Sequence, residues 1–338
     1  MHEASLYKKL GNNTVKCGLC NHFCLIEADK RGACGVRENH DGKLVSLNYG
    51  KLVAEHIDPI EKKPFFHFLP GSQAYSISTV GCNFGCLFCQ NWEISQSPKG
   101  GGVIDGEVVK PEDVVKAVKE NGCESIAYTY VEPTIFYEYA RDVAVLAKKE
   151  RIRNVWVSNG FMSREMLDDL IENNLMDAIN VDLKSFSEKF YLTKCKAKVE
   201  PVKENIKFLA KSPVWLEVTM LLIPGANDSD DEIKGCADFL ADISKDIPWH
   251  VSAFYPAYKM MNSAPTLPET LVKARDIGLK AGLKYVYIGN LPYLNGENTI
   301  CPKCGEAVIE RMGYSVRRND NKGKCVSCGE NLEGIWCE

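Results

Sequence analysis

The chain has 338 residues, 45% hydrophobic and 25% charged, with a formal net charge of −4 at pH 7. A chain of this size can bury one large core with small appendages, and its mildly negative charge gives no basic footprint, so we do not expect a protein that binds nucleic acid non-specifically. Apolar runs fall short of the roughly 20 residues that a membrane span needs and the N-terminus does not read as a signal peptide, so we expect a cytoplasmic protein without a membrane partner.

A first group of cysteines near the N-terminus follows the pattern C-x2-C-x3-C-x9-C. It consists of Cys17, Cys20, Cys24 and Cys34. In a cytoplasmic chain of this length, clustered cysteines indicate metal binding more than disulfides. The uneven spacing, with His22 inside the loop as a substitute ligand, fits structural zinc and fits an accessory iron–sulfur cluster that shuttles electrons. We therefore expect zinc or a second cluster within residues 1–70.

A second group follows an apolar, strand-like run over residues 74–80. Cys82, Cys86 and Cys89 form C-x3-C-x2-C, with Gly81 and Gly85 giving the backbone freedom to wrap closely around a cofactor. Thiolates are ligands suited to iron–sulfur clusters, and a fully ligated cluster normally takes four of them. Three cysteines can hold three corners of a four-iron cluster and leave the fourth iron open for chemistry.

The central part of the chain alternates short strand-like runs with longer segments of helical periodicity. Repeated strand-then-helix units imply parallel strands with right-handed crossovers, which predicts an α/β fold with a partial (β/α)6 TIM-type barrel over residues 71–297. The predicted strands are 74–80, 125–130, 154–157, 178–183, 215–220 and 250–254, with 285–288 as a seventh. The clearest predicted helices are 143–149, 164–171, 230–240 and 269–280.

Polar residues follow three of these strands. Glu132 comes after the second strand, Asn159 after the third, and Asp182 and Lys184 at the end of the fourth. The carboxyl ends of parallel strands are where α/β sheets and barrels bind ligands, so we expect these side chains at the mouth of a site. Purely structural roles also fit: Glu132 can initiate a helix together with Pro133, and Asp182 can form a simple ion pair with Lys184.

A third group of cysteines lies in residues 298–338. It consists of two knuckles, Cys301 with Cys304 and Cys325 with Cys328, in the pattern C-x2-C-x20-C-x2-C. Four thiolates close the coordination sphere of a structural zinc ion, so the pattern predicts a C-terminal zinc ribbon, with rubredoxin-type iron or an iron–sulfur cluster as the alternative.

Four further cysteines stand alone, and we expect ordinary thiols there. They are Cys123, Cys195, Cys236 and Cys337.

The C-x3-C-x2-C motif resembles the signature of radical S-adenosylmethionine (SAM) enzymes. Over residues 74–260, the motif together with the polar residues at the strand ends resembles the glycyl-radical-enzyme activating enzymes, such as the pyruvate formate-lyase activating enzyme. The segments Lys62–Pro64, Leu69–Gly71 and Cys89–Glu93 and the two terminal cysteine groups look more specifically like the radical SAM member of the AmmeMemoRadiSam system. Val157 and Tyr255 stand where such activating enzymes carry an acidic residue and a histidine.

The resemblance implies a [4Fe–4S] cluster on the three central cysteines, with SAM bound to the open iron. It implies reductive cleavage of SAM and hydrogen abstraction by a 5′-deoxyadenosyl radical. It further implies SAM contacts from Glu132, Asn159, Asp182 and Lys184, and an electron donor of the flavodoxin or ferredoxin type. It assigns no further catalytic side chain.

These observations lead to one main hypothesis and two alternatives. The main hypothesis is a radical SAM enzyme that abstracts hydrogen from an unidentified substrate, with a partner protein as one candidate. The second is radical modification of a small molecule or an RNA. The third belongs to another class of protein: a non-catalytic adaptor whose iron–sulfur and zinc sites are all structural.

Overall fold

The computed structural model describes residues 2–291 and 295–336, with an eight-stranded sheet at its centre. The order is β16-β15-β14-β13-β12-β11-β9-β8. Strands β9 and β11 to β16 run parallel to one another, and β8 pairs antiparallel with β9. The bounds are β8 (Ala54–Pro59), β9 (Gln73–Ser78), β11 (Ser125–Tyr128), β12 (Arg153–Ser158), β13 (Ala178–Asp182), β14 (Trp215–Leu222), β15 (Trp249–Ala253) and β16 (Val286–Gly289). This α/β architecture is consistent with a partial barrel, and it confirms the seventh predicted strand.

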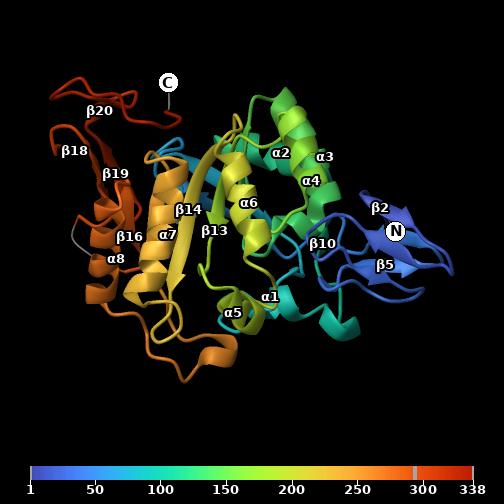
Figure 1. Ribbon diagram of the computed structural model, residues 1–338. Coiled ribbons are helices and arrows are strands. Elements are labelled where there is room, and N and C mark those ends of the chain that lie inside the picture. The colour runs from blue at the N-terminus through green and yellow to red at the C-terminus, as the bar shows by residue number, and fades with distance from the viewer. Residues whose placement is uncertain (1, 292–294, 337–338) are drawn as a thin grey trace.

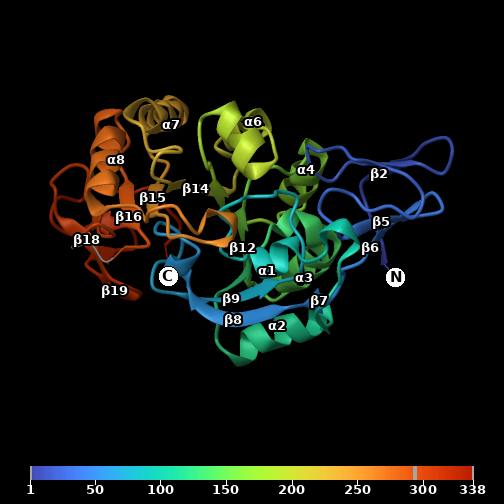
Figure 2. The same cartoon turned by 90° about the horizontal axis from the view of Figure 1, so that it is seen from below.

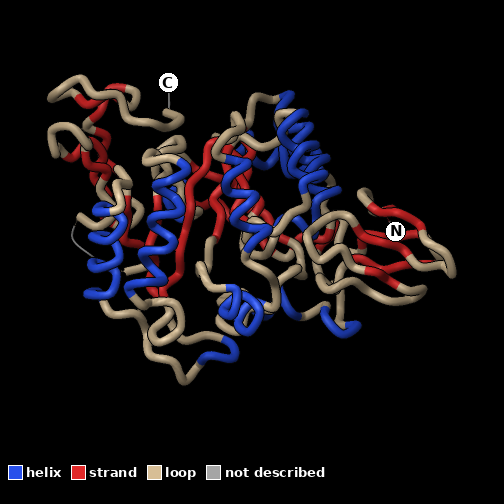
Figure 3. Tube along the Cα trace, viewed as in Figure 1, coloured by secondary structure: helices blue, strands red, loops and turns tan. Residues whose placement is uncertain are grey.

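Helices pack around this sheet and connect its parallel strands (Figures 1 and 3). The longer ones are α2 (Pro111–Glu120), α3 (Tyr137–Lys149), α4 (Arg164–Glu172), α6 (Glu200–Leu209), α7 (Asp230–Ile243) and α8 (Pro268–Lys280). The side chains of Ser163 and Ser229 accept hydrogen bonds from the first turns of α4 and α7, which fixes where these helices begin. Helices α2 and α6, of 10 residues each, were not among the clearest predicted helices.

Strand β8 comes from the segment that the sequence assigned to the N-terminal cysteine-rich region. Figure 2 shows it alongside β9 at the edge of the sheet. Its residues Glu55, Asp58 and Pro59 are poor strand formers, so no strand was predicted from this segment. Backbone pairing with β9, from Ala54 opposite Ser78 to Pro59 opposite Gln73, holds the strand in place. The division into 1–70, 71–297 and 298–338 remains a proposal in which β8 already belongs to the central sheet.

The N-terminal region consists of two small three-stranded sheets at one end of the molecule (Figure 1). One contains β2 (Tyr7–Lys9), β3 (Val15–Cys17) and β4 (Leu25–Ile26), and the other β1 (His2–Glu3), β6 (Lys43–Ser46) and β5 (Arg37–His40). A short pair, β7 (Lys51–Leu52) with β10 (Glu107–Val108), follows. Arg37 on β5 forms a buried ion pair with Glu138 on α3 and so ties this region to the barrel.

The C-terminal region lies at the opposite end of the molecule (Figure 1). Its strands are β17 (Thr299–Ile300), β18 (Ala307–Met312), β19 (Ser315–Arg318), β20 (Asp320–Asn321) and β21 (Lys324–Cys325). A small apolar cluster that includes Phe66, Tyr287 and Val308 joins this region to the barrel. The backbone of Ile335 also bonds to that of His67 and Leu69, at 2.7 Å in both cases.

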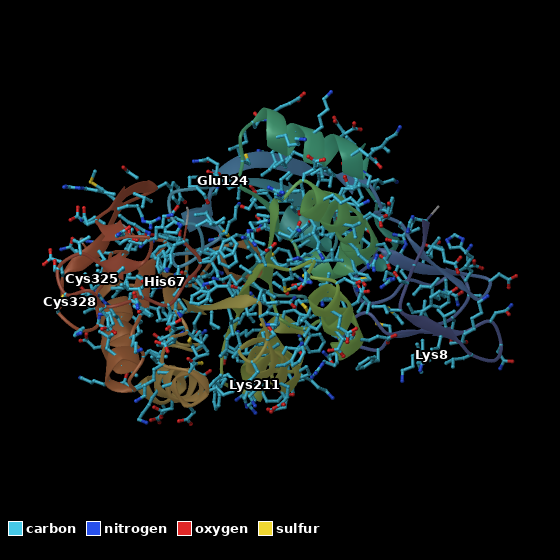
Figure 4. The ribbon with its side chains drawn as sticks, turned by 90° about the horizontal axis from the view of Figure 1, so that it is seen from above. Lys8, His67, Glu124, Lys211, Cys325 and Cys328 are labelled. Carbon is cyan, nitrogen blue, oxygen red and sulfur yellow. The ribbon has the colours of Figure 1, made fainter. Side chains whose placement is uncertain are left out.

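Buried polar groups at the amino end of the strands reinforce this junction. Glu217, near the start of β14 and fully buried, accepts hydrogen bonds from the backbone of Phe66 and His67 and lies 2.6 Å from Nε2 of His250. Figure 4 shows His67 on the same side of the molecule as Cys325 and Cys328, with Lys8 of the N-terminal region far from them. The opposite edge of the sheet, where the parallel strands have their carboxyl ends, is therefore left for the site. Among the described helices, none has the length and apolarity needed to cross a bilayer.

Candidate active site

The three central cysteines lie in the loop that follows β9, at the carboxyl end of that strand. Gly81, which precedes the first cysteine, has a φ of +106°, and a Cβ atom there would lie 2.6 Å from Cγ1 of Val36. Only glycine fits this conformation and this close approach. Cys86 is buried, and Cys82 and Cys89 are half-buried. The loop therefore presents its thiols at the end of the sheet where ligands are expected.

A turn of π-helix over residues 191–195 holds the cysteine loop through two backbone hydrogen bonds. The N–H of Gly85 donates to the carbonyl of Cys195 at 2.8 Å, and the N–H of Leu87 donates to that of Lys194 at 2.9 Å. The turn follows the short helix α5 (Glu188–Phe190), which Figure 1 shows near α1 (Trp92–Gln96) at the same end of the sheet. Phe84 packs against Phe161, with ring centroids 5.3 Å apart, and so closes one side of the loop to water.

The three thiols are in an environment that disfavours free thiolates. Burial and the nearby Glu132 carboxylate raise the pKa of Cys82. A hydrogen bond with Cys195 and burial raise the pKa of Cys86, and burial raises that of Cys89. Three neighbouring thiols of this kind become thiolates when a cationic metal centre compensates their charge. The donor set is therefore suited to a metal centre.

Glu132 and Asn159 lie directly beside the cysteine loop. The Glu132 carboxylate accepts hydrogen bonds from the N–H of Asn159 at 2.7 Å and from the hydroxyl of Ser158 at 2.8 Å, and it caps the turn that begins at Pro133 through the N–H of Thr134. The Asn159 amide donates to Oδ1 of Asn83 at 2.7 Å, between the first two cysteines. The carboxyl ends of β11 and β12 are thereby connected to the cysteine loop.

Asp182 and Lys184 form an ion pair, with Nζ of Lys184 2.8 Å from Oδ2 of Asp182. Burial lowers the pKa of Lys184, but the Asp182 carboxylate and the nearby Cys86 raise it well above its usual value. The Lys184 ammonium also lies 6.0 Å from the ring centroid of Phe88, inside the cysteine motif. The structure thus brings the sequence-predicted residues of β13 to the same edge as those of β11 and β12.

Comparisons with known proteins agree with this geometry. Residues 76–237 match the family model of the radical SAM superfamily. Over 337 residues the chain is 42% identical to the uncharacterized protein MJ0808 of Methanocaldococcus jannaschii, a match covering 98% of this chain and 99% of the relative. Residues 76–237 of the chain are a radical SAM domain.

The more distant relatives include an enzyme that activates a glycyl-radical enzyme. Over 220 residues the chain is 23% identical to pyruvate formate-lyase 1-activating enzyme of Escherichia coli K12, covering 61% of this chain and 89% of that enzyme. Among solved structures, a radical SAM methyltransferase from Sphaerobacter thermophilus superposes with a TM-score of 0.50 at 17% identity, covering 70% of this chain and 71% of that one. The sequence match establishes homology to a glycyl-radical-enzyme activating enzyme, and the superposition shows a shared fold.

A radical SAM domain implies a [4Fe–4S] cluster and SAM, and the residues present fit both groups. Nδ2 of Asn83, within the cysteine motif, is buried and is without a hydrogen-bond partner in the described structure. Buried amide groups are nearly always hydrogen-bonded, so an orphaned donor here indicates a missing acceptor. Cluster sulfur and the polar atoms of SAM are acceptors of the required kind.

The two terminal cysteine groups differ in how tightly their sulfur atoms gather. In the C-terminal group, Sγ of Cys301 lies 3.6 Å from Sγ of Cys328, and Sγ of Cys304 lies 3.7 Å from Sγ of Cys325. The ligand atoms of these four cysteines all lie within 4.8 Å of one another, and no other group of three or more metal-ligating side chains among the described residues is this close together. The N-terminal four instead surround a small cavity.

Sequence reasoning missed several residues of the radical SAM site. Cys195 was expected to be an ordinary thiol, yet it lies near enough to raise the pKa of Cys86, from 109 positions along the chain. Asn83 had no assigned role, and the hydroxyl of Ser95, 3.3 Å from Sγ of Cys89, was not noticed. Only folding brings Cys195 to the motif, whereas Asn83 could have been found from its place inside it. Cys123 and Cys236 are buried, and Cys337 lies outside the described residues.

Proposed function

We propose that this chain is a radical SAM enzyme that holds a [4Fe–4S] cluster on Cys82, Cys86 and Cys89 and binds SAM at the iron without a cysteine. The observation that carries the proposal is the three-thiol loop with its orphaned Asn83 amide, joined through Asn159 to Glu132 at the carboxyl edge of the sheet. When bound, the cluster and SAM supply reductive cleavage of the sulfonium to methionine and a 5′-deoxyadenosyl radical, which abstracts hydrogen from the substrate.

The residues around the loop would bind and orient SAM. In this proposal, Glu132 and Asn159 form the wall beside the amino group of the methionine moiety. Lys184, whose pKa lies well above its usual value, stays cationic and faces the SAM carboxylate, while Asp182 orients the lysine and contacts ribose hydroxyls. Phe84 and Phe88, both buried, keep water away from the cluster, which protects a reactive radical from side reactions.

The substrate that we propose is a partner protein, with an electron donor of the flavodoxin or ferredoxin type. Homology to activating enzymes over 61% of the chain supports this choice over a small molecule or an RNA. The segments and terminal cysteine groups described above further support a place beside the radical SAM member of the AmmeMemoRadiSam system.

The C-terminal cysteines are proposed to hold a structural zinc ion. With Zn–S bonds of about 2.3 Å, a tetrahedral site places its sulfur atoms about 3.8 Å apart. The distances of 3.6 and 3.7 Å between the paired sulfur atoms support such a site. The N–H of Gly305 bonds the carbonyl of Cys301, and that of Gly329 bonds the carbonyl of Cys325, so both knuckles have the same geometry.

The decisive experiment is SAM cleavage by anaerobically reconstituted protein with dithionite, measured as 5′-deoxyadenosine by liquid chromatography. We expect product from the wild type and complete loss in Cys82→Ala, Cys86→Ala and Cys89→Ala. Cys123→Ala is the matched control, because it removes a buried thiol that lies at the other end of β11. Product that persists without the three cysteines, or a wild type that binds metal without cleaving SAM, would reject the proposal in favour of a non-catalytic adaptor.

The substrate class can be tested by isotope transfer. The enzyme is incubated with extract from cells grown in deuterated medium, and deuterium in 5′-deoxyadenosine is measured by mass spectrometry. A protein substrate predicts transfer that survives gel filtration and ribonuclease and is lost after protease treatment. Transfer from the low-molecular-weight fraction, or transfer sensitive to ribonuclease, identifies a small molecule or an RNA instead.

A further inference from the structure

The four N-terminal cysteines surround a cavity that has the features of a ligand site. Cys17, Cys20 and Cys34 are buried and Cys24 is half-buried. The remaining wall is mostly apolar and includes Leu19, Ile26 and Ile135. An apolar shell around convergent thiols excludes water and shields the charge of a bound metal centre.

The spacing of these sulfur atoms is unlike that of a mononuclear zinc site. Such a site places all four sulfur atoms about 3.8 Å apart, as the C-terminal group nearly does. The four N-terminal sulfur atoms are not such a set among the described residues, although all four cysteines line one cavity. In an iron–sulfur cluster the cysteines bind different iron atoms, so their sulfur atoms lie further apart around a larger core. The three central cysteines are likewise not a set of ligand atoms within 4.8 Å of one another among the described residues.

Arg37 gives an independent indication of an anionic occupant. Its side chain is 1% exposed, lines the cavity, and uses Nη2 to bind Glu138 and the carbonyl of Ser5. Its Nε and Nη1 atoms are buried without hydrogen-bond partners in the described structure. Oε2 of Glu138 is also unpaired there, and a bidentate pair with this carboxylate would use only one of the two donors. Buried guanidinium donors are costly when unpaired, so an acceptor belongs beside them. Cluster sulfides and cysteine thiolates are anionic acceptors for N–H donors.

The cavity lies directly against the central cysteine loop. Nε2 of His22, which also lines the cavity, is 2.8 Å from the carbonyl oxygen of Asn83. A Cβ atom on Gly81 would lie 3.1 Å from the carbonyl oxygen of Cys34. The path from Cα of Cys34 through its carbonyl oxygen to Gly81, and on to Cα of the next residue, Cys82, puts these two Cα atoms at most about 11 Å apart. The two sites share a wall.

We propose that Cys17, Cys20, Cys24 and Cys34 hold a second iron–sulfur cluster that passes electrons to the cluster at the central cysteines. The relay rests on the proposed function; the presence of the cluster does not. One electron from a reduced flavodoxin- or ferredoxin-type donor reduces the N-terminal cluster. That cluster is oxidised again as the central cluster is reduced, so each SAM cleaved consumes one donor electron.

The first test is the metal content of a variant without the central site. The triple variant Cys82→Ala, Cys86→Ala, Cys89→Ala is reconstituted anaerobically, and iron, sulfide and zinc are measured. We expect equal iron and acid-labile sulfide, about two or four of each per chain, and an electron paramagnetic resonance signal after reduction. Zinc at both terminal groups with no iron or sulfide overturns the proposal and leaves dithionite-driven SAM cleavage by the wild type untouched.

The second test separates a relay from a structural cluster. Cys24→Ala, which removes the least buried ligand, should keep SAM cleavage with dithionite and lose cleavage with reduced flavodoxin. Equal activity with both reductants overturns the relay. If Cys24→Ala does not fold, Arg37→Lys serves instead: it keeps a cation beside Glu138 but removes the fixed pair of donors. Its N-terminal cluster should show a lower reduction potential in a redox titration, and an unchanged potential contradicts the arrangement.

Discussion

The two cysteine-rich ends of this chain each contain four cysteines but hold their sulfur atoms at different spacings. At the C-terminal end, paired sulfur atoms lie 3.6 and 3.7 Å apart in knuckles that the backbone shapes by itself. At the N-terminal end, the cysteines stand around a cavity that borders the central site. The C-terminal cysteine group packs near the amino end of the strands, away from the central cysteine loop. The comparison teaches that two groups of four cysteines in one chain can differ in sulfur spacing and in their place in the fold, and it is these two differences that lead us to propose different metal centres.

The buried arginines at the two ends extend the contrast. Arg311 joins the C-terminal region to the barrel, where its terminal nitrogens bond Thr299, Glu297 and the carbonyl of Phe66, and its Nε lies 3.6 Å from Glu61. Arg37 leaves two donors facing the cysteine cavity. Within the described part of the chain, Arg311 thus has one donor, Nε, without a hydrogen bond, and that donor faces the Glu61 carboxylate, whereas Arg37 has two such donors.

The largest effect that sharpens this comparison should come from Cys325→Ala. Structural zinc sites contribute about 10–16 kcal/mol of apparent binding energy, so loss of one ligand should unfold the segment from about residue 298 onward. We expect loss of zinc and rapid proteolysis of this segment, with iron at the central cysteines retained. Cys123→Ala should change neither readout. Loss of central iron in a protein whose barrel remains folded would contradict the separation of roles.

A smaller effect is expected for Arg311→Met. The side chain of Glu61 is 2% exposed, and removing its cation leaves a buried unpaired charge, which costs about 3–5 kcal/mol. Denaturant unfolding followed at the C-terminal junction should show the loss, while the iron content of both cluster sites stays unchanged. The double variant Arg311→Met, Glu61→Leu should recover most of the stability, because an apolar pair replaces the charges. Failure to recover would mean that the hydrogen bonds of Arg311, and not its charge, hold the junction.

The smallest effect concerns the wall between the N-terminal and central sites. Gly81→Ala forces a Cβ atom to 2.6 Å from Val36 at a φ of +106°, and strain of this kind costs about 1–3 kcal/mol. We expect lower thermal stability and lower iron occupancy of the central cysteines. Gly122→Ala is the control, because its φ is +64° and a Cβ atom there meets nothing within 4 Å. Equal iron occupancy in the two variants would show that the contact with Val36 does not shape the central site.

The sequence by itself determined the α/β class, the seven parallel strands and the cysteine motif, because strand periodicity and ligand spacing are local properties of the chain. It also placed Glu132, Asn159, Asp182 and Lys184 at one edge, since parallel topology brings the ends of strands together. It could not find β8, whose polar edge sequence becomes a strand only when paired with β9.

Tertiary structure alone decided which distant groups meet at the site. Cys195 reaches Cys86 through the turn after α5, and His22 reaches Asn83 across 61 positions of sequence. The spacing C-x2-C-x3-C-x9-C is compatible with zinc and with a cluster, because ligand order along a chain does not fix the distances between sulfur atoms. Only folding sets those distances and buries Arg37 with Nε and Nη1 unpaired among the described residues. These two observations are the basis for proposing an iron–sulfur cluster at the N-terminal cysteines.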